Sequence, residues 1–166
     1  MNKTITTIVA TAIMTMVSCN DQNFNKINTT EQEKETAIFP KGEKASEVVF
    51  TGTAYLNTLV DDKDNIFNSQ VYDVVFEPSV RNNWHSHPGG QILLVTVGKG
   101  YYQERGKDAR LLQKGDVVEI LPDVVHWHGA APDSEFTHIG ISTNTQKGGA
   151  VWFEVVSNED YESAIK

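Results

Sequence analysis

The chain has 166 residues, of which 39% are hydrophobic, and it carries a formal net charge of −8. This length and apolar content suffice for one domain of ordinary size with its own core. The acidic balance argues against nucleic acid and anionic membrane surfaces as partners, because a polyanion would be repelled over most of the surface. We therefore expect the partner to be a small molecule.

The first 18 residues are predicted to be a signal peptide. Lys3 precedes an apolar run, interrupted by threonines, that extends from Ile5 to Val17. A short basic start followed by such a run is typical of a secretory signal. The run is shorter than the roughly 20 residues that a bilayer-crossing helix needs, so a stable transmembrane segment is the weaker interpretation. The sequence thus predicts export to the periplasm or the cell surface.

Cys19 is the only cysteine of the chain and stands where the apolar run ends. No disulfide can therefore form within the chain. The order Met16-Val17-Ser18-Cys19 resembles the lipobox of bacterial lipoproteins, with Met16 where leucine is usual. The resemblance implies that Cys19 becomes a lipidated first residue, which would be the protein's contact with a membrane. The alternative is an ordinary signal peptide with an incidental cysteine.

Residues 19–47 are predicted to form a flexible tether. Asn, Gln, Thr, Glu and Lys dominate the segment. It has too few apolar side chains to offset the entropy of ordering its backbone. A tether of this kind would let a lipid-anchored domain stand off a membrane, and the same composition also fits a plain disordered tail.

The folded domain is expected over residues 48–157, where runs of Val, Ile, Phe, Tyr and Thr alternate with turn residues such as Gly98-Lys99-Gly100. This region contains no helix-length apolar stripe. The domain is therefore predicted to be all-β, as a sandwich, jelly roll or barrel, followed by a short helix or tail over 158–166 with Asn158 as a possible N-cap. Eight strands are expected within 48–56, 71–76, 92–97, 101–105, 109–112, 116–120, 136–142 and 151–156.

Four of the five histidines form two pairs with i, i+2 spacing, His85 with His87 and His126 with His128. Residues two apart on a strand share a face, and a Pro-Gly-Gly turn brings Gln91 back toward the first pair. Neutral imidazoles are the commonest ligands of first-row transition metals. The spacing predicts a divalent metal site formed by His85, His87 and His126. Gln91 is either its fourth ligand or a turn-capping amide.

These residues resemble the two sequence motifs of the cupin superfamily. The spacing of His85, His87, Gln91 and Gly98 follows the first motif, although most cupins carry glutamate where Gln91 stands. The second motif is looser, and its histidine is His126. The resemblance implies a double-stranded β-helix, the cupin jelly roll, with a metal inside the barrel. It implies no particular reaction, because cupins host oxidases, isomerases, decarboxylases, lyases and inert binding proteins.

The region is also similar to small single-domain cupins with a His-His-Gln-His site. This group includes manganese-dependent hydroxynitrile lyases and cupins associated with carboxymuconolactone-decarboxylase-like domains. The resemblance implies that His85, His87, Gln91 and His126 bind manganese, with Fe, Zn, Ni and Co as alternatives. It also implies that His138 stands near the open coordination positions as an acid or base. Small cupins commonly pair through their N-terminal strand, which implies a homo-oligomer, either a dimer or a tetramer.

Other pocket positions follow from strand alternation and from the same resemblance. In residues 136–142, His138 and Ser142 share one face. The lyases of the group use a threonine and a glutamine at the positions that Asn82 and Ser142 occupy here. His128 is expected to orient His126 or to line the pocket mouth. The predicted pocket residues are Tyr72, Val74, Asn82, His128 and Ser142.

The favoured function is that of an enzyme in which a divalent metal acts as a Lewis acid on a small organic substrate. His138 would move a proton during cyanohydrin cleavage, decarboxylation or related chemistry. The alternatives are an Fe(II)-dependent oxygenase and a non-catalytic small-molecule-binding or sensor protein. An ionisable side chain near the open metal positions favours the enzyme.

Overall fold

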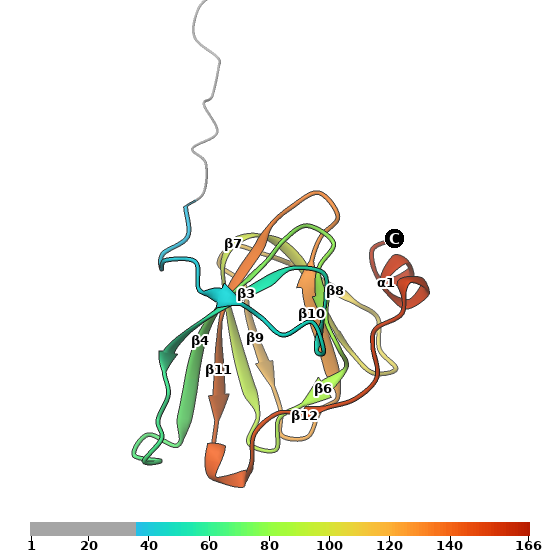
Figure 1. Ribbon diagram of the computed structural model, residues 1–166. Helices are drawn as coiled ribbons and strands as arrows, with labels where there is room; N and C mark the ends of the chain where they lie inside the picture. The colour runs from blue at the N-terminus through green and yellow to red at the C-terminus, as the bar shows by residue number, and fades with distance from the viewer. Residues whose placement is uncertain (1–35) are drawn as a thin grey trace, which may run out of the picture. The chain divides into compact units, whose positions relative to one another are not determined.

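Figure 1 shows the computed structural model of the protein, which describes residues 36–166. The predicted signal peptide, Cys19 and the first part of the predicted tether lie outside the described residues. Within 36–166, no helix is both long enough and apolar enough to cross a membrane.

The described residues form twelve β-strands in one antiparallel array that curls on itself (Figure 1). The all-β prediction is confirmed, and the last element is a short helix, as expected. The strands are β1 Glu43–Lys44, β2 Phe50–Thr51, β3 Ala54–Val60, β4 Ser69–Phe76, β5 Arg81–Asn82, β6 His85–Ser86, β7 Gln91–Glu104, β8 Arg110–Gln113, β9 Val117–Ile120, β10 His126–Ala130, β11 Phe136–Thr143 and β12 Val151–Trp152; the helices are the short 3₁₀ turn η1 Thr145–Lys147 and α1 Asn158–Ala164.

β7 belongs to both halves of the curled sheet. Its first part pairs with β9 and β11, and its second part pairs with β8 and β10. The predicted turn at 98–100 is therefore wrong, because the chain bends there within a single strand. Gly98 has a φ of +70°, and a Cβ built on it would lie 1.8 Å from the carbonyl oxygen of Glu135. Only glycine fits this close approach without a backbone shift.

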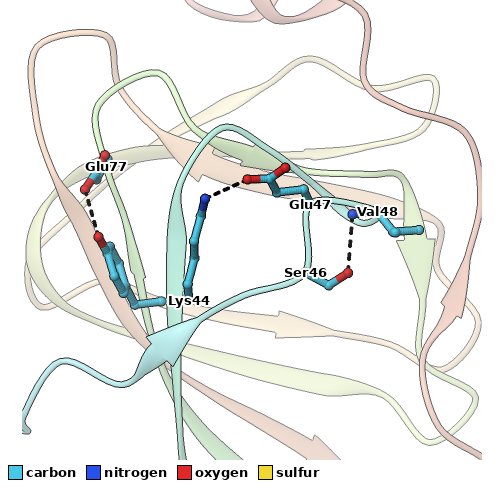
Figure 2. Close-up of polar contacts among 6 residues, drawn as sticks. Lys44, Ser46, Glu47, Val48 and Glu77 are labelled. Carbon is cyan, nitrogen blue, oxygen red and sulfur yellow. Dashed lines mark hydrogen bonds and ion pairs between the residues drawn. The ribbon is translucent and has the colours of Figure 1, made fainter.

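The paired sheet starts ahead of the predicted domain boundary at residue 48, since β1 pairs with β3. Figure 2 shows the turn that follows β1. The Lys44 ammonium donates to the Glu47 carboxylate at 2.6 Å, and the Val48 N–H donates to the Ser46 hydroxyl oxygen at 3.3 Å. Residues 43–47, which lie within the predicted tether, thus form the first strand and turn of the folded domain.

Inward-facing apolar side chains of the strands fill the interior, as period-two alternation predicts. Phe76 and Phe136 are fully buried, with ring centroids 6.0 Å apart. Leu93 and Leu112 are equally buried. Full burial of one such side chain contributes about 1.5–3 kcal/mol. This apolar packing also contacts two of the histidines, because Phe76 packs against the rings of His128 and His138.

Helix α1 packs outside the curled sheet, against β10. The Tyr161 hydroxyl donates to a carbonyl oxygen of that strand at 2.7 Å. The N-cap is Ser157, whose hydroxyl accepts the N–H of Asp160 at 3.0 Å. The expectation that Asn158 caps the helix is wrong, because its side chain accepts a hydrogen bond from Arg81 at 2.7 Å instead.

Candidate metal centre and cavity

A cavity of about 420 Å³ lies inside the curled sheet. The residues that line it come from β2 to β7, from β10 to β12 and from loops beside these strands, and all five predicted pocket residues are among them. Three predicted metal ligands and the candidate base also line it, whereas His126 is fully buried and does not. The predicted site residues on the cavity wall are Tyr72, Val74, Asn82, His85, His87, Gln91, His128, His138 and Ser142.

His85 and His126 face each other from paired strands. They are register partners between β6 and β10, and their ring centroids lie 4.1 Å apart. Each Nδ1 lies near the carbonyl oxygen two residues earlier, at 3.0 Å from Asn83 and 2.9 Å from Val124. A carbonyl oxygen only accepts, so each Nδ1 carries the proton. Each neutral ring therefore keeps its lone pair on Nε2, as in metal-ligating histidines.

His87 and Gln91 bring two further lone pairs to the same place. The Nε2 of His87 is buried and has no hydrogen-bond partner. The amide oxygen of Gln91 lies 3.1 Å from Nε2 of His126. Because Nδ1 of His126 already carries the proton, one acceptor faces another there, and a cation between them would relieve the repulsion. These atoms fit a bound metal ion.

The tightest set of ring nitrogens differs from the predicted one. His85, His126 and His128 have ligand atoms within 4.8 Å of one another, and His87 is not in this set. The ring of His128, however, already has protein partners. It lies 3.1 Å from the Asn82 amide nitrogen and 3.2 Å from Nε2 of His138. Since Nε2 of His87 has no partner, the polar contacts favour His87 as the third imidazole and leave His128 beside the site.

The turn between β6 and β7 fixes the position of Gln91. The Gly90 N–H donates to the carbonyl oxygen of His87 at 3.0 Å. The Thr143 hydroxyl donates to the carbonyl oxygen of Gly89 at 2.8 Å. A Cβ on Gly89 would lie 1.8 Å from the Thr143 carbonyl oxygen, so this close contact requires glycine. The hydrogen bond and the close contact thus hold the Pro-Gly-Gly turn against the end of β11.

Burial keeps the site histidines neutral. Loss of solvation lowers the pKa of His87, His126 and His138 to about 4, and it lowers the pKa values of His85 and His128 well below the usual range. Their lone pairs are therefore available at neutral pH. Among the described residues that line the cavity, none is aspartate or glutamate. A divalent ion held here would keep its full charge.

His138, on β11, is a buried residue of the cavity wall. Its Nδ1 is buried and has no hydrogen-bond partner. Its ring packs beside those of Phe76 and Phe136, with centroid distances of 5.7 and 5.4 Å. The ring meets His128 edge-on at a centroid distance of 4.7 Å. A neutral imidazole at the wall of the cavity can accept a proton from a bound molecule and return it.

Trp152 is a cavity residue that the sequence reasoning missed. Its ring stacks on His85 at a centroid distance of 4.7 Å and is 40% exposed. It lies on β12, which pairs with β6 and is only two residues long, although a strand over 151–156 was predicted. The spacing of residues in the sequence does not indicate that segments so far apart pair with each other. The aromatic residue shortly after Gly148 and Gly149 was the only local indication.

A curled double-stranded β-helix with histidines from facing strands directed inward is a β-barrel of the cupin type. A family model described as a cupin domain matches residues 72–139. The (R)-mandelonitrile lyase of Granulicella tundricola is 39% identical over 112 residues, which cover 68% of this chain and 85% of that protein. The chain belongs to the cupin superfamily.

Solved structures agree with this assignment. A cupin-like protein from Thermotoga maritima shares 61% sequence identity with a TM-score of 0.77, over 78% of this chain and 97% of that one. A cupin-2 domain protein from Rhodospirillum rubrum is 13% identical with a TM-score of 0.55, over 73% and 76% of the two chains, and it supports the fold alone. The predicted cupin jelly roll is confirmed.

Proposed function

We propose that the protein is a metal-dependent lyase that cleaves a cyanohydrin into an aldehyde or ketone and hydrogen cyanide. The observation that carries the proposal is the position of His138, which brings an unpartnered ring nitrogen to a cavity that also holds a neutral histidine cluster. The 39% identity to an (R)-mandelonitrile lyase supports the reaction class.

The metal would be held by His85, His87, His126 and the amide oxygen of Gln91. Neutral nitrogen and oxygen donors suit divalent first-row ions, and we propose Mn²⁺, with Fe, Zn, Ni and Co as alternatives. Bound there, the ion would act as a Lewis acid that polarises the substrate oxygen.

His138 would act first as the general base and then as the general acid of the reaction. With its pKa at about 4 it is neutral at pH 7 and can accept the hydroxyl proton of the cyanohydrin. The O–H bonding pair becomes the second bond of the carbonyl group, and the pair of the broken C–C bond leaves with cyanide. The same imidazole then returns the proton to cyanide, so the products are the carbonyl compound and HCN.

The cavity wall would select the organic part of the substrate. Val49, Phe50 and Leu56 line it and offer an apolar surface. Tyr72, on β4 next to the strand that carries Leu56, also lines the cavity, and its hydroxyl donates to the Gln70 amide oxygen at 3.0 Å. A cavity of about 420 Å³ suits a small molecule with a single compact apolar group.

The test is an assay of metal-loaded protein with mandelonitrile and with an aliphatic cyanohydrin, in which aldehyde release is followed. We expect release that a chelator abolishes and that Mn²⁺ restores. Stoichiometric metal without release from any cyanohydrin would contradict the lyase. Oxygen consumption in place of release would indicate an oxygenase, and ligand binding without turnover would indicate a sensor.

We also propose that the protein is exported and held at a membrane by a lipid on Cys19. The support is the sequence before this residue, with an apolar run and a lipobox-like end. Labelled palmitate should enter the wild-type protein in cells and should not enter Cys19→Ala. Equal labelling of the two proteins would contradict the anchor.

We propose further that the domain forms a homo-oligomer. On β7 and β11, side chains that alternate with the buried inward ones are aliphatic and only partly buried, namely Ile92, Leu94, Ile139 and Ile141. Aliphatic side chains on the outer face of a sheet favour burial against another surface. Light scattering should give the mass of a dimer or tetramer, and a monomer mass would contradict this proposal.

A further inference from the structure

The three imidazoles proposed to bind the metal are held in two different ways. His85 and His126 each donate Nδ1–H to a backbone carbonyl oxygen two residues earlier. Nδ1 of His87 instead lies 3.3 Å from the side-chain oxygen of Ser142 on β11. The orientation of His87 thus depends on a side chain that a mutation can remove, whereas that of the other two does not.

We infer that Ser142 is a positioning residue for the metal centre: its hydroxyl accepts Nδ1–H of His87 and so directs Nε2 toward the ion. The inference rests on the proposed role of His87 as a ligand. A proton held on Nδ1 leaves the lone pair on Nε2, and Nε2 is the buried atom without a partner. The hydrogen bond also makes the ring a stronger donor to a metal.

The backbone around His87 is already fixed, so Ser142 has only the ring to orient. The carbonyl oxygen of His87 accepts hydrogen bonds from the N–H groups of Gly90 and Asp123, both at 3.0 Å. Ser142 itself is fixed by strand pairing, as the register partner of Gln91 between β11 and β7. One position on β11 therefore stands beside two of the proposed ligands.

Ser142 also reaches the cavity, where solvent can enter. Water could replace part of the lost hydrogen bond in a Ser142→Ala variant, so the loss of metal affinity should be moderate. Removal of a residue that orients a ligating histidine typically weakens metal binding about 10- to 100-fold. We expect Ser142→Ala to fall in this range, and Ser142→Thr, which keeps the hydroxyl, to stay within about threefold of the wild type.

The experiment is a calorimetric titration of the metal-free full chain with Mn²⁺ for wild type, Ser142→Ala and Ser142→Thr. Ser86→Ala is the matched control, because Ser86 lies between the two histidines and alternation directs it to the other face. We expect Ser86→Ala to bind Mn²⁺ as the wild type does. Unchanged affinity in Ser142→Ala, failure of Ser142→Thr to restore binding, or an equal loss in Ser86→Ala would overturn the inference.

A double-mutant cycle separates positioning from general disturbance of the cavity. In a His87→Ala background, Ser142→Ala should have no further effect on Mn²⁺ affinity, because the ring that it orients is absent. An equal loss in both backgrounds would overturn the inference and leave the metal site in place. A wild type that binds no Mn²⁺ would instead overturn the proposed metal site itself, so the two failures are distinguishable.

Discussion

The buried histidines form two groups that share an environment and differ in their contacts. His85, His87 and His126 bind protein acceptors through Nδ1 and leave Nε2 without a protein donor. His128 and His138 contact each other, at 3.2 Å between Nδ1 and Nε2. Desolvation lowers the pKa values of both groups.

The comparison shows that burial alone does not determine what a histidine does. When Nδ1–H of a neutral imidazole donates to the protein, the lone pair on Nε2 remains available to bind a cation. A pair of imidazoles in contact can pass a proton between them. The first group therefore suits metal binding and the second suits proton transfer, and the predictions below test whether these roles separate.

The largest expected effect is on turnover. His138→Ala should lower kcat for cyanohydrin cleavage about 10²- to 10⁴-fold, the usual contribution of a general acid or base. Bound metal should stay at the wild-type level, because no proposed ligand is removed. Steady-state kinetics together with elemental analysis would check both parts. If His138→Ala also lost its metal, His138 would belong to the first group and the separation would be wrong.

The second prediction concerns the pH dependence of the metal-free protein. A histidine with a folded pKa of about 4 and an unfolded pKa of about 6.5 stabilises the fold above pH 6.5, and this contribution is lost as the pH falls toward 4. Between pH 7.5 and pH 5 the loss is about 2 kcal/mol for each such histidine.

Urea unfolding of chelator-treated protein at pH 7.5, 6 and 5 measures this loss. His138→Ala should show a shallower decrease than the wild type, by the contribution of one histidine. Equal stability at pH 7.5 and pH 5 would mean that the site histidines of the metal-free protein are not buried in the neutral form. The two groups would then not share the desolvation that lowers their pKa values.

The smallest expected effect concerns Asn82, which holds His128 of the second group in place. Asn82 accepts the backbone N–H of His128 at 3.0 Å, and its amide nitrogen lies 3.1 Å from the His128 ring. Asn82→Ala leaves a buried donor without a partner, which should cost about 1–3 kcal/mol of unfolding free energy. Mn²⁺ affinity should change less than threefold. A tenfold loss of affinity would show that the two groups are coupled through this contact.

Much of the site was predictable because it rests on local spacing. The pairs at 85 and 87 and at 126 and 128, and the turn that returns Gln91, are encoded within short segments whose alternation determines the face. The fold class followed from the runs of β-branched residues and the breaks between them. Family resemblance then joined the two segments into one metal centre.

What the sequence did not show depends on distant pairing. The contacts of Asn82 with His128 and of Ser142 with His87 join segments that are far apart in the sequence, and no local pattern specifies which of them meet. The stacking of Trp152 on His85 arises in the same way. Glycine is common both in turns between strands and at bends within one strand, so Gly98 alone does not tell the two apart. The pairing of β7 with both halves of the sheet shows that Gly98 is a bend.

The most direct test is the metal content of the purified full chain, measured by elemental analysis for wild type, His87→Ala and His128→Ala. We predict about one divalent ion per wild-type chain, a large loss in His87→Ala, and near-complete retention in His128→Ala. No stoichiometric metal in the wild type would contradict the metal centre. Retention in His87→Ala with loss in His128→Ala would show that the compact set of His85, His126 and His128 binds the ion instead.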